Sequence, residues 1–384
     1  QTHAPCLVGK LVMKFGGTSM GSAGRIQVAA RLTAEQHAKR PVAIVVSAMA
    51  KVTDLLLDTT RKAEAANVGE VVELIKGHDV VVNCTYGAKC MEILDAAIAA
   101  RIPYIDVHGT LLMQERFSRS EPAKAAGVTA LIGTGVSPGL TNMMAAWGAR
   151  QFKGEVTIEC EYATFRPINP TEGLLETALR QFRNGVQVPV FEDGKLSYLP
   201  PFSGALKTRF PGMDEEVELV YTPHSEPQTI PRFVKNAKRV TVRGAYQASI
   251  MTLLKSLYTF GLMDPARKVT VDGRKVDFAP LLREALHGDG SPKPADVNTS
   301  YVMRVRVSGD GGTIETTIGH PPGWDALPQG RMTSLQPAYA ARLIAKGEFI
   351  HPGVVGAELF TDAQVEGCLA HLRSRGLWVD QARR

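Results

Sequence analysis

The sequence has no long uninterrupted apolar run and no recognisable leader. Its apolar runs fall short of the roughly 20 residues that a membrane-spanning helix needs, so we predict no membrane insertion. The first residues, QTHAPCLVGK, contain no charged region followed by a long apolar region, and they lack an initiator Met. They therefore predict no secretory signal, and the chain is interpreted as processed or truncated.

Cysteine is scarce and irregularly spaced. The five Cys residues stand at positions 6, 84, 90, 160 and 368, an odd number that no disulfide framework uses completely. Neither CxxC nor HExxH occurs, which excludes common zinc signatures, and we predict no metal site. Scattered free thiols are typical of a reducing compartment, so we predict a cytoplasmic protein.

The composition is that of an ordinary globular protein of about two domains, with 384 residues of which 44% are apolar and 21% charged. The net charge of +6 and the pI near 9.0 favour anionic ligands such as phosphates or carboxylates. The basic residues are dispersed and are not interleaved with aromatic residues. We therefore predict no nucleic-acid partner.

The stretch from His78 to Asn142 organises the chain. Three β-branched runs, Val80–Cys84, Tyr104–Val107 and Thr129–Thr134, alternate with segments whose apolar residues recur at helical spacing. Such runs are typical of the central strands of a parallel sheet covered by helices. Each run ends in small or polar residues, and the carboxyl ends of parallel strands are where ligands bind.

A strand–glycine turn–helix–strand pattern precedes this stretch. Leu11–Phe15 leads into GGTSMGSAG, a predicted helix at Arg25–His37 and a second strand at Val42–Val46. The turn has the outer glycines of a dinucleotide fingerprint, but Thr18 replaces the middle one and no acid closes the second strand. Two interpretations stay open: a phosphate-bearing ligand, with a lean towards NADP, or a turn needed only for packing.

The segments KFGGTSMGS and VAIVVSAMAKVTDLL, within about residues 10–63, resemble the opening of aspartate kinases. The resemblance implies ATP-phosphate contacts by Lys14, Gly16, Gly17 and Ser19. The remainder of such a kinase has no counterpart in this sequence.

A second resemblance covers about residues 68–384. HDVVVNCTYG, GTGVSPGLTN, YTPHSEPQTIPR and RVTVRGAYQASIMTLLKSLYTFGL are similar to segments of the saccharopine dehydrogenase-like oxidoreductases. The resemblance implies NADP or NAD as cofactor and a small-molecule amino-acid or polyamine substrate, and we expect a homodimer. Members form or cleave secondary amines that join amino acids or polyamines to oxo-acids or aldehydes.

We therefore expect an α/β protein, with a Rossmann-like doubly wound parallel sheet and a second, mixed α/β substrate domain. The predicted boundaries are 1–145 for the nucleotide-binding domain and 146–345 for the substrate and dimerisation domain. Residues 346–384 are expected to form C-terminal helices that pack back on the first domain.

The predicted cofactor contacts lie in the glycine turn and at strand ends: Gly16, Gly17, Thr18, Ser19, Gly21, Ser47, Asn83, Thr85, Tyr86 and Gly135. For Asn83 and its neighbours, the alternative is a polar strand end that caps the next helix. The predicted substrate contacts are Ser137, Pro138, Gly139, Asn142, Ser225 and Arg243. Many relatives have an acidic residue where Ser137 stands. Arg209 and Arg232 are alternative carboxylate ligands.

Candidate proton-transfer groups are His224, Glu226 and Asp106. The intrinsic pKa of histidine lies near neutrality, and Glu226 is close enough in sequence to orient the ring of His224. His108 is a rival, and a structural role for a single loop histidine is the alternative.

The predicted function is an NAD(P)-dependent oxidoreductase of the saccharopine dehydrogenase type, acting on a C–N bond. One alternative is a nucleotide-binding remnant of aspartate kinase. The other is a non-catalytic scaffold that has lost its dinucleotide site.

Overall fold

The computed structural model describes residues 11–15, 31, 34–35, 42–46, 68–85, 89–110, 112–165, 172–211, 213, 216–287, 300–325 and 328–384. The chain divides into two compact units. The first joins Gln1–Ile132 to Ala340–Val355, and the second joins Gly133–Tyr339 to Gly356–Arg384. The boundaries at residues 145 and 345, predicted for the nucleotide-binding and substrate domains, stay a prediction.

The first unit is built on a parallel sheet. Its strands are β3 (Val81–Asn83), β4 (Tyr104–Asp106), β5 (Thr129–Leu131) and β16 (Gly353–Val355), in the order β16-β5-β4-β3. Every residue of β4 and β5 is buried, as expected for strands covered on both faces. The three strands predicted from the apolar runs are thereby confirmed.

Helices connect these strands, because parallel neighbours need crossover connections. They are α4 (Cys90–Ala100) between β3 and β4, and α5 (Met113–Ser118) and α6 (Ser120–Ala126) between β4 and β5, while α3 (Val68–Ile75) precedes β3. The apolar core includes Leu94 of α4, Tyr104 of β4 and Val354 of β16. The predicted first strands, β1 (Leu11–Phe15) and β2 (Val42–Val46), form a parallel pair.

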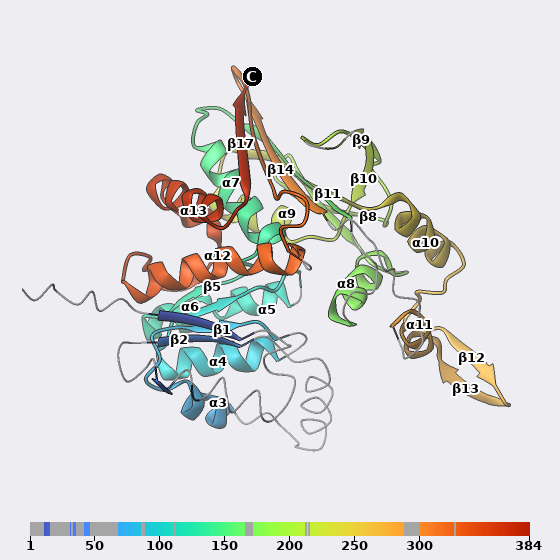
Figure 1. Cartoon of the computed structure of the whole chain (residues 1–384), viewed down its shortest axis with the longest axis horizontal. Helices are drawn as coiled ribbons and strands as arrows, with labels where there is room; N and C mark the ends of the chain where they lie inside the picture. The colour runs from blue at the N-terminus through green and yellow to red at the C-terminus, as the bar shows by residue number, and fades with distance from the viewer. Residues whose placement is uncertain are drawn as a thin grey trace, which may run out of the picture. The chain divides into compact units, whose positions relative to one another are not determined.

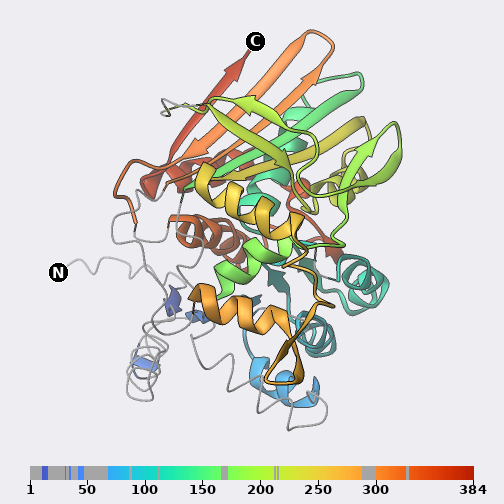
Figure 2. The same ribbon diagram turned by 90° about the vertical axis from the view of Figure 1, so that its right-hand side faces the viewer.

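The second unit contains a mixed sheet (Figure 2). Its strands are β6 (Val156–Phe165), β7 (Val188–Glu192), β8 (Lys195–Leu199), β9 (Leu206–Thr208), β10 (Val217–Tyr221), β11 (Ala237–Tyr246), β14 (Ser300–Gly309), β15 (Gly312–Gly319) and β17 (Trp378–Arg383). The order is β17-β15-β14-β6-β11-β10-β9, and β7 pairs with β8 and β11. Only β6 and β11 pair in parallel among these strands. Together with the parallel sheet, this sheet confirms the predicted α/β class with a mixed second part.

Helices α7 (Thr141–Ala149), α9 (Glu226–Phe233) and α13 (Asp362–Ser374) lie along the mixed sheet (Figure 1). Gly148 of α7 approaches β14 so closely that a Cβ there would lie 2.7 Å from Val307 Cγ2. Val307 pairs with Ile158, so the face of β6 that contains Ile158 and Tyr162 is turned towards α7. The alternate residues, including Glu159 and Glu161, lie on the opposite face.

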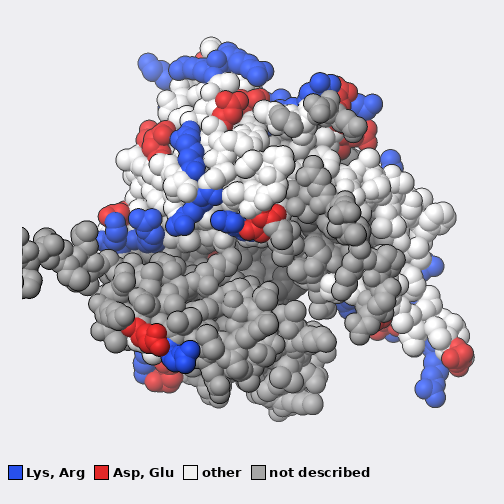
Figure 3. Space-filling model, in the orientation of Figure 1, with Lys and Arg blue, Asp and Glu red and all other residues white. Residues whose placement is uncertain are grey.

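A smaller helical layer adjoins the sheet (Figure 2). It contains α8 (Glu172–Phe182), α10 (Ala248–Thr259) and α11 (Phe278–His287), around a core that includes Leu175 and Leu254. The hairpin of β12 (Lys268–Val271) and β13 (Arg274–Asp277) extends from this layer and carries charges of both signs (Figure 3). The remaining helix is α12 (Pro328–Ala345). In the described part of the chain, no helix is long and apolar enough to cross a membrane.

Candidate functional site

The connection Val136–Leu140 presents Ser137 at the start of α7. Gly135 and Gly139 have φ values of 151° and 123°, and the Ser137–Pro138 peptide bond is cis. The Gly135 N–H donates to Gln336 Oε1 at 3.0 Å, which ties this connection to α12. A Cβ on Gly139 would lie 2.9 Å from the Thr134 carbonyl carbon, so the backbone path depends on a glycine there.

Ser137 links the two predicted proton-transfer groups of the second unit. Its hydroxyl donates to Glu226 Oε1 at 2.6 Å and lies 3.0 Å from His224 Nδ1. Thr141, the first residue of α7, donates a second hydroxyl to the same carboxylate oxygen at 2.7 Å. His224 and Glu226, predicted from the PHSEP segment, therefore lie together, and Ser137 joins them.

The hydrogen bonds define the tautomer of His224. Because the single hydroxyl hydrogen of Ser137 points to Glu226, Ser137 accepts from His224 Nδ1, which must carry a hydrogen. The other ring nitrogen, Nε2, lies 3.0 Å from Gln181 Nε2, which can only donate. His224 thus has a protonated Nδ1 and a lone pair at Nε2, as a general base requires.

Two tyrosines complete the surroundings of the imidazole. The Tyr162 ring lies against His224 with ring centroids 5.0 Å apart and ring planes tilted by 33°, and the Tyr246 hydroxyl donates to Gln181 Oε1 at 3.1 Å. Burial raises the pKa of Tyr162 far above its ordinary value, so its hydroxyl stays protonated. Gly244 faces Tyr162 across the sheet, where a Cβ would overlap the ring.

Glu226 is a buried carboxylate that stays ionised. Burial acts to raise its pKa, but the neighbouring imidazole of His224, with the hydroxyls of Ser137 and Thr141, lowers it below the ordinary value. Its second oxygen, Oε2, lies 3.7 Å from His224 Nδ1. The carboxylate therefore orients the ring and compensates its charge when the ring takes up a proton.

Asn142, a predicted substrate contact, lies in a second buried cluster. Its Oδ1 accepts from the Gly139 N–H at 2.9 Å, and its Nδ2 donates to Thr229 Oγ1 at 2.8 Å and Glu358 Oε1 at 2.6 Å. Burial raises the pKa of Glu358 despite the hydrogen bond from Asn142. The described contacts of Asn142 are thus internal to the protein.

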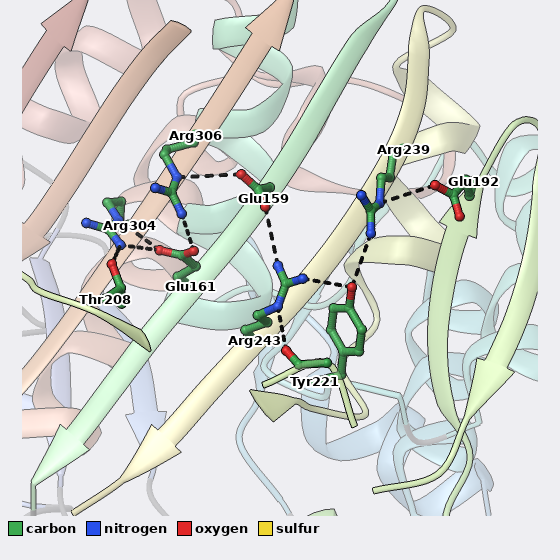
Figure 4. A network of polar contacts seen from close by, with 10 residues as sticks. Glu159, Glu161, Glu192, Thr208, Tyr221, Arg239, Arg243, Arg304 and Arg306 are labelled. Carbon is green, nitrogen blue, oxygen red and sulfur yellow. Dashed lines mark hydrogen bonds and ion pairs between the residues drawn. The ribbon is translucent and has the colours of Figure 1, made fainter. Parts of the chain in front are cut away.

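Arg243, another predicted substrate contact, belongs to a charged network on the other face of the sheet (Figure 4). Its guanidinium donates to Gly204 O at 3.0 Å, Tyr221 Oη at 2.8 Å and Glu159 Oε1 at 3.3 Å. The further members are Glu161, Glu192, Thr208, Arg239, Arg304 and Arg306. All three nitrogens of Arg243 are engaged within the sheet.

Asp106 lies in the first unit, at the end of β4. Arg116 Nη1 donates to both of its carboxylate oxygens, at 3.0 and 3.1 Å, and both side chains are fully buried. The same nitrogen reaches the carbonyl of His108 at 3.3 Å. The negative charge of Asp106 is thereby compensated, and catalysis by Asp106 stays a prediction.

Asn83 and Thr85 form a compact polar end to β3. Asn83 Nδ2 donates to the Tyr104 hydroxyl at 2.9 Å, and its Oδ1 accepts from both the backbone N–H and the hydroxyl of Thr85. This is the turn geometry expected of an Asn that caps a strand end. At the carboxyl ends of β3 and β4, Asn83 and Thr85 are neutral and the charge of Asp106 is compensated by Arg116. These described side chains therefore present no uncompensated negative charge that would repel an anionic dinucleotide.

The other predicted cofactor contacts lie outside the described residues. They are Gly16, Gly17, Thr18, Ser19, Gly21, Ser47 and Tyr86, together with Lys14 as far as its side chain is concerned. Gly135, Pro138 and Gly139 lie in the connection that carries Ser137. Ser225 is fully buried and directly precedes α9.

A large cavity of about 1130 Å³ opens in the second unit, beside the hydrogen-bond network of His224 and Gln181. Tyr246, whose hydroxyl bonds Gln181, is part of its wall, as are the aromatic rings of Tyr301 and Trp378. Glu216, Glu218 and Lys255 also line this cavity. A cavity of this size, lined by apolar, aromatic and charged residues, can accommodate a small molecule.

Sequence reasoning missed the residues that complete the hydrogen-bond network. Gln181 lies in a segment whose local pattern indicates only a helix, and nothing there singles it out. Thr141 lies in the singled-out segment GTGVSPGLTN, but no specific role is predicted for it from the sequence. Tyr162 and Gly244 offered a signal in principle, because a glycine within a strand often marks a close approach.

Comparison with known proteins extends these observations. Residues 21–131 match the family model of the saccharopine dehydrogenase NADP binding domain, which bears out the expected NAD(P) cofactor. The match begins earlier than residue 68, where the resemblance was expected to begin. The carboxynorspermidine synthase of Vibrio alginolyticus is 24% identical over 64% of this chain. This chain spans 63% of the length of that relative.

The apo saccharopine dehydrogenase (L-Glu forming) of Saccharomyces cerevisiae shares the fold. The comparison has a TM-score of 0.61 at 12% identity and covers 97% of this chain and 99% of the other. The beginning of the chain is similar to an aspartokinase of Bacillus sp., at 48% identity over 59 residues, which are 15% of this chain and 14% of that protein. Both resemblances expected from the sequence are therefore confirmed, the second as a short partial match.

Proposed function

We propose that this chain, whose NADP-binding segment and fold are those of saccharopine dehydrogenase-like proteins, is an NAD(P)-dependent oxidoreductase acting on a C–N bond. The observation that carries the proposal is the environment of the His224 imidazole, whose Nδ1 donates to Ser137 and whose Nε2 accepts from Gln181. Reduction of a C=N bond adds a hydride to carbon and a proton to nitrogen, and oxidation of an amine releases both. The nicotinamide supplies or accepts the hydride, which leaves the proton to the protein.

His224 is the proposed proton-transfer residue. Once substrate displaces the Gln181 amide from it, the Nε2 lone pair takes the proton released from the substrate nitrogen, or returns it in the opposite direction. Ser137 and Glu226 fix the ring through Nδ1, and the ionised carboxylate stabilises the imidazolium that forms. Ser225, Pro138 and Gly139 shape this wall of the site rather than exchange protons.

The cavity beside Tyr246 is the proposed substrate chamber. Glu216 and Glu218 favour an ammonium group, and Lys255 favours a carboxylate. The aromatic walls suit methylene chains and cations. These features support a substrate that joins an amino acid to a polyamine or a second amino acid, in keeping with the name of the Vibrio relative.

Ligand titration is the first test. We expect purified protein to bind NADPH or NADH at micromolar concentration, seen as enhanced nicotinamide fluorescence and a rise in melting temperature. Binding of ATP alone would favour the kinase-like alternative, to which the aspartokinase similarity gives specific support. Binding of none of the three would overturn the oxidoreductase proposal and leave the scaffold alternative.

Kinetic comparison of two histidine variants tests the role of His224. We expect His224→Gln to lower kcat by about 10²–10⁴-fold while dinucleotide binding is retained. The matched control is His78→Gln, because His78 is exposed and its ring contacts only carbonyl oxygens of its own segment. Equal activity of His224→Gln and the parent would exclude His224 as the proton-transfer residue. The predicted homodimer is tested separately by sedimentation velocity.

A further inference from the structure

Gln181 of α8 lies between His224 and two tyrosine hydroxyls. Its amide nitrogen is 3.0 Å from His224 Nε2 and 3.4 Å from the Tyr162 hydroxyl, and its amide oxygen accepts from Tyr246 at 3.1 Å. A primary amide has a donor end and an acceptor end of nearly the same shape. A tyrosine hydroxyl can donate or accept, so neither tyrosine fixes which end of the amide faces the imidazole.

We propose that the Gln181 amide turns by half a rotation when His224 takes up a proton, so that it donates to the neutral ring and accepts from the imidazolium. Gln181 is then a positioning residue that holds His224 in both of its protonation states. The proposal rests on the proposed function only in treating His224 as the group that exchanges protons.

The donors and acceptors of the protonated ring favour rotation of the Gln181 amide. A proton added at Nε2 turns the only acceptor of the ring into a donor, while Nδ1 continues to donate to Ser137. Without rotation, two N–H groups would face each other at 3.0 Å. After rotation, Gln181 Oε1 accepts from Nε2–H and from the Tyr162 hydroxyl, and its nitrogen donates to the Tyr246 hydroxyl.

The positive charge of the protonated His224 ring is also compensated. The ionisable groups that face the imidazole are Glu226, through Oε2 at 3.7 Å, and the hydroxyls of Tyr162 and Tyr246 through Gln181. The positive charge of the imidazolium therefore pairs with one buried carboxylate, and rotation of a neutral amide adds no further charge. Gln181 keeps its contacts with His224, Tyr162 and Tyr246 in both states, and the donor and acceptor of each of the three hydrogen bonds are exchanged.

Nuclear magnetic resonance on the cofactor-free full chain tests the rotation directly. In ¹⁵N- and ¹³C-labelled parent protein we expect a scalar coupling across the hydrogen bond from Gln181 Nε2 to His224 Nε2 at high pH. When the ring is protonated, we expect a coupling from His224 Nε2 to the Gln181 side-chain carbonyl carbon in its place, because protonation without rotation would remove the first coupling and give no second one. His224 signals are identified by their absence in His224→Gln. A first coupling that is missing at high pH, or a second coupling that is missing once the ring is protonated, would overturn the proposal.

Two variants provide an independent measurement. Gln181→Glu can only accept, so we expect the titration of His224 to move to higher pH by about one unit or more, since a carboxylate favours the imidazolium. Gln181→Leu removes the acceptor end, and the titration should move to lower pH. Gln151→Leu is the control, because the side chain of Gln151 is exposed and donates to the Trp147 carbonyl of its own helix end.

An unchanged titration in folded Gln181→Glu would contradict the proposal, and circular dichroism establishes that the variant is folded. Neither measurement uses substrate or dinucleotide. A protein that fails to bind NADPH but shows both couplings would therefore disprove the oxidoreductase proposal alone.

Discussion

Arg116 Nη1 donates to both carboxylate oxygens of Asp106, and neither side chain is exposed to solvent. A buried pair of this kind is costly to break, because the remaining charge has no compensation. We predict that Arg116→Met lowers the free energy of unfolding by about 3–5 kcal/mol. Urea denaturation measures the change.

The control for this prediction is the pair of Arg119 and Asp95, with side chains 36% and 35% exposed and an N–O distance of 2.7 Å. Because water screens that pair, Arg119→Met should cost at most about 1 kcal/mol. Equal losses in the two variants would contradict the interpretation of Asp106 and Arg116 as a buried structural pair.

The fold was predictable largely where hydrophobic period and turn chemistry agree. The hairpin of β7 and β8 has a signal in the sequence, because Asp193-Gly194 is a dipeptide typical of tight hairpin turns, and both residues have positive φ, 48° and 77°, as such turns require. Strands β3, β4 and β5 were predictable from their β-branched runs, whereas β16 lies in a segment that was expected to form helices. The hairpin β12–β13 was missed, because its strands are four residues long and largely exposed and show little apolar periodicity.

The site was predictable only where its residues are close in sequence. His224 and Glu226 could be paired because they lie two positions apart, whereas the link through Ser137 joins residues separated by 87 and 89 positions. The engagement of Asp106 by Arg116 and of Arg243 by Tyr221 depends likewise on tertiary packing. Single-sequence patterns carry no information about such distant contacts.

Gly139 is predicted to be essential for the connection that presents Ser137. Its φ of 123° is unfavourable for other residues, and a Cβ would press on the Thr134 backbone. We expect Gly139→Ala to destabilise the protein by about 1–3 kcal/mol and to reduce activity. In Gly127→Ala, where φ is 70° and a Cβ meets nothing within 4 Å, the cost should be about 1–2 kcal/mol, with activity retained. Thermal unfolding and turnover of both variants test the difference.

Glu358 should make stability depend on pH. Burial raises its folded pKa above the ordinary value of 4.5, so its contribution to stability is present below pH 4.5 and is lost as pH rises through the folded pKa. Glu226 acts in the opposite sense, because its pKa is lowered in the folded protein. Its ionised carboxylate contributes stability above pH 4.5, and this contribution is lost as pH falls through the folded pKa.

The variant Glu358→Gln separates these two effects. An amide keeps the acceptor for Asn142 but cannot ionise, so we expect the variant to be more stable than the parent at pH 8 and nearly equal at pH 4.5. Glu366→Gln, an exposed position on α13, is the control and should follow the parent at both pH values. A parent that is more stable than Glu358→Gln at pH 8 would contradict the raised pKa of Glu358.

The thiols should react in an order set by burial. Burial raises the pKa of Cys90 to about 11 and that of Cys368 to about 12, and it raises the pKa of the fully buried Cys160 as well. Cys84 is partly exposed. Because the thiolate is the reactive form, we expect Ellman's reagent at pH 8 to modify Cys84 well before the other three. A Cys6→Ser background removes the remaining thiol from the count. In that background, Cys84→Ser should abolish the fast phase, and denaturation should release the three slow thiols together. A fast phase that survives in Cys84→Ser would mean that one of the buried thiols is reached through local opening of its unit.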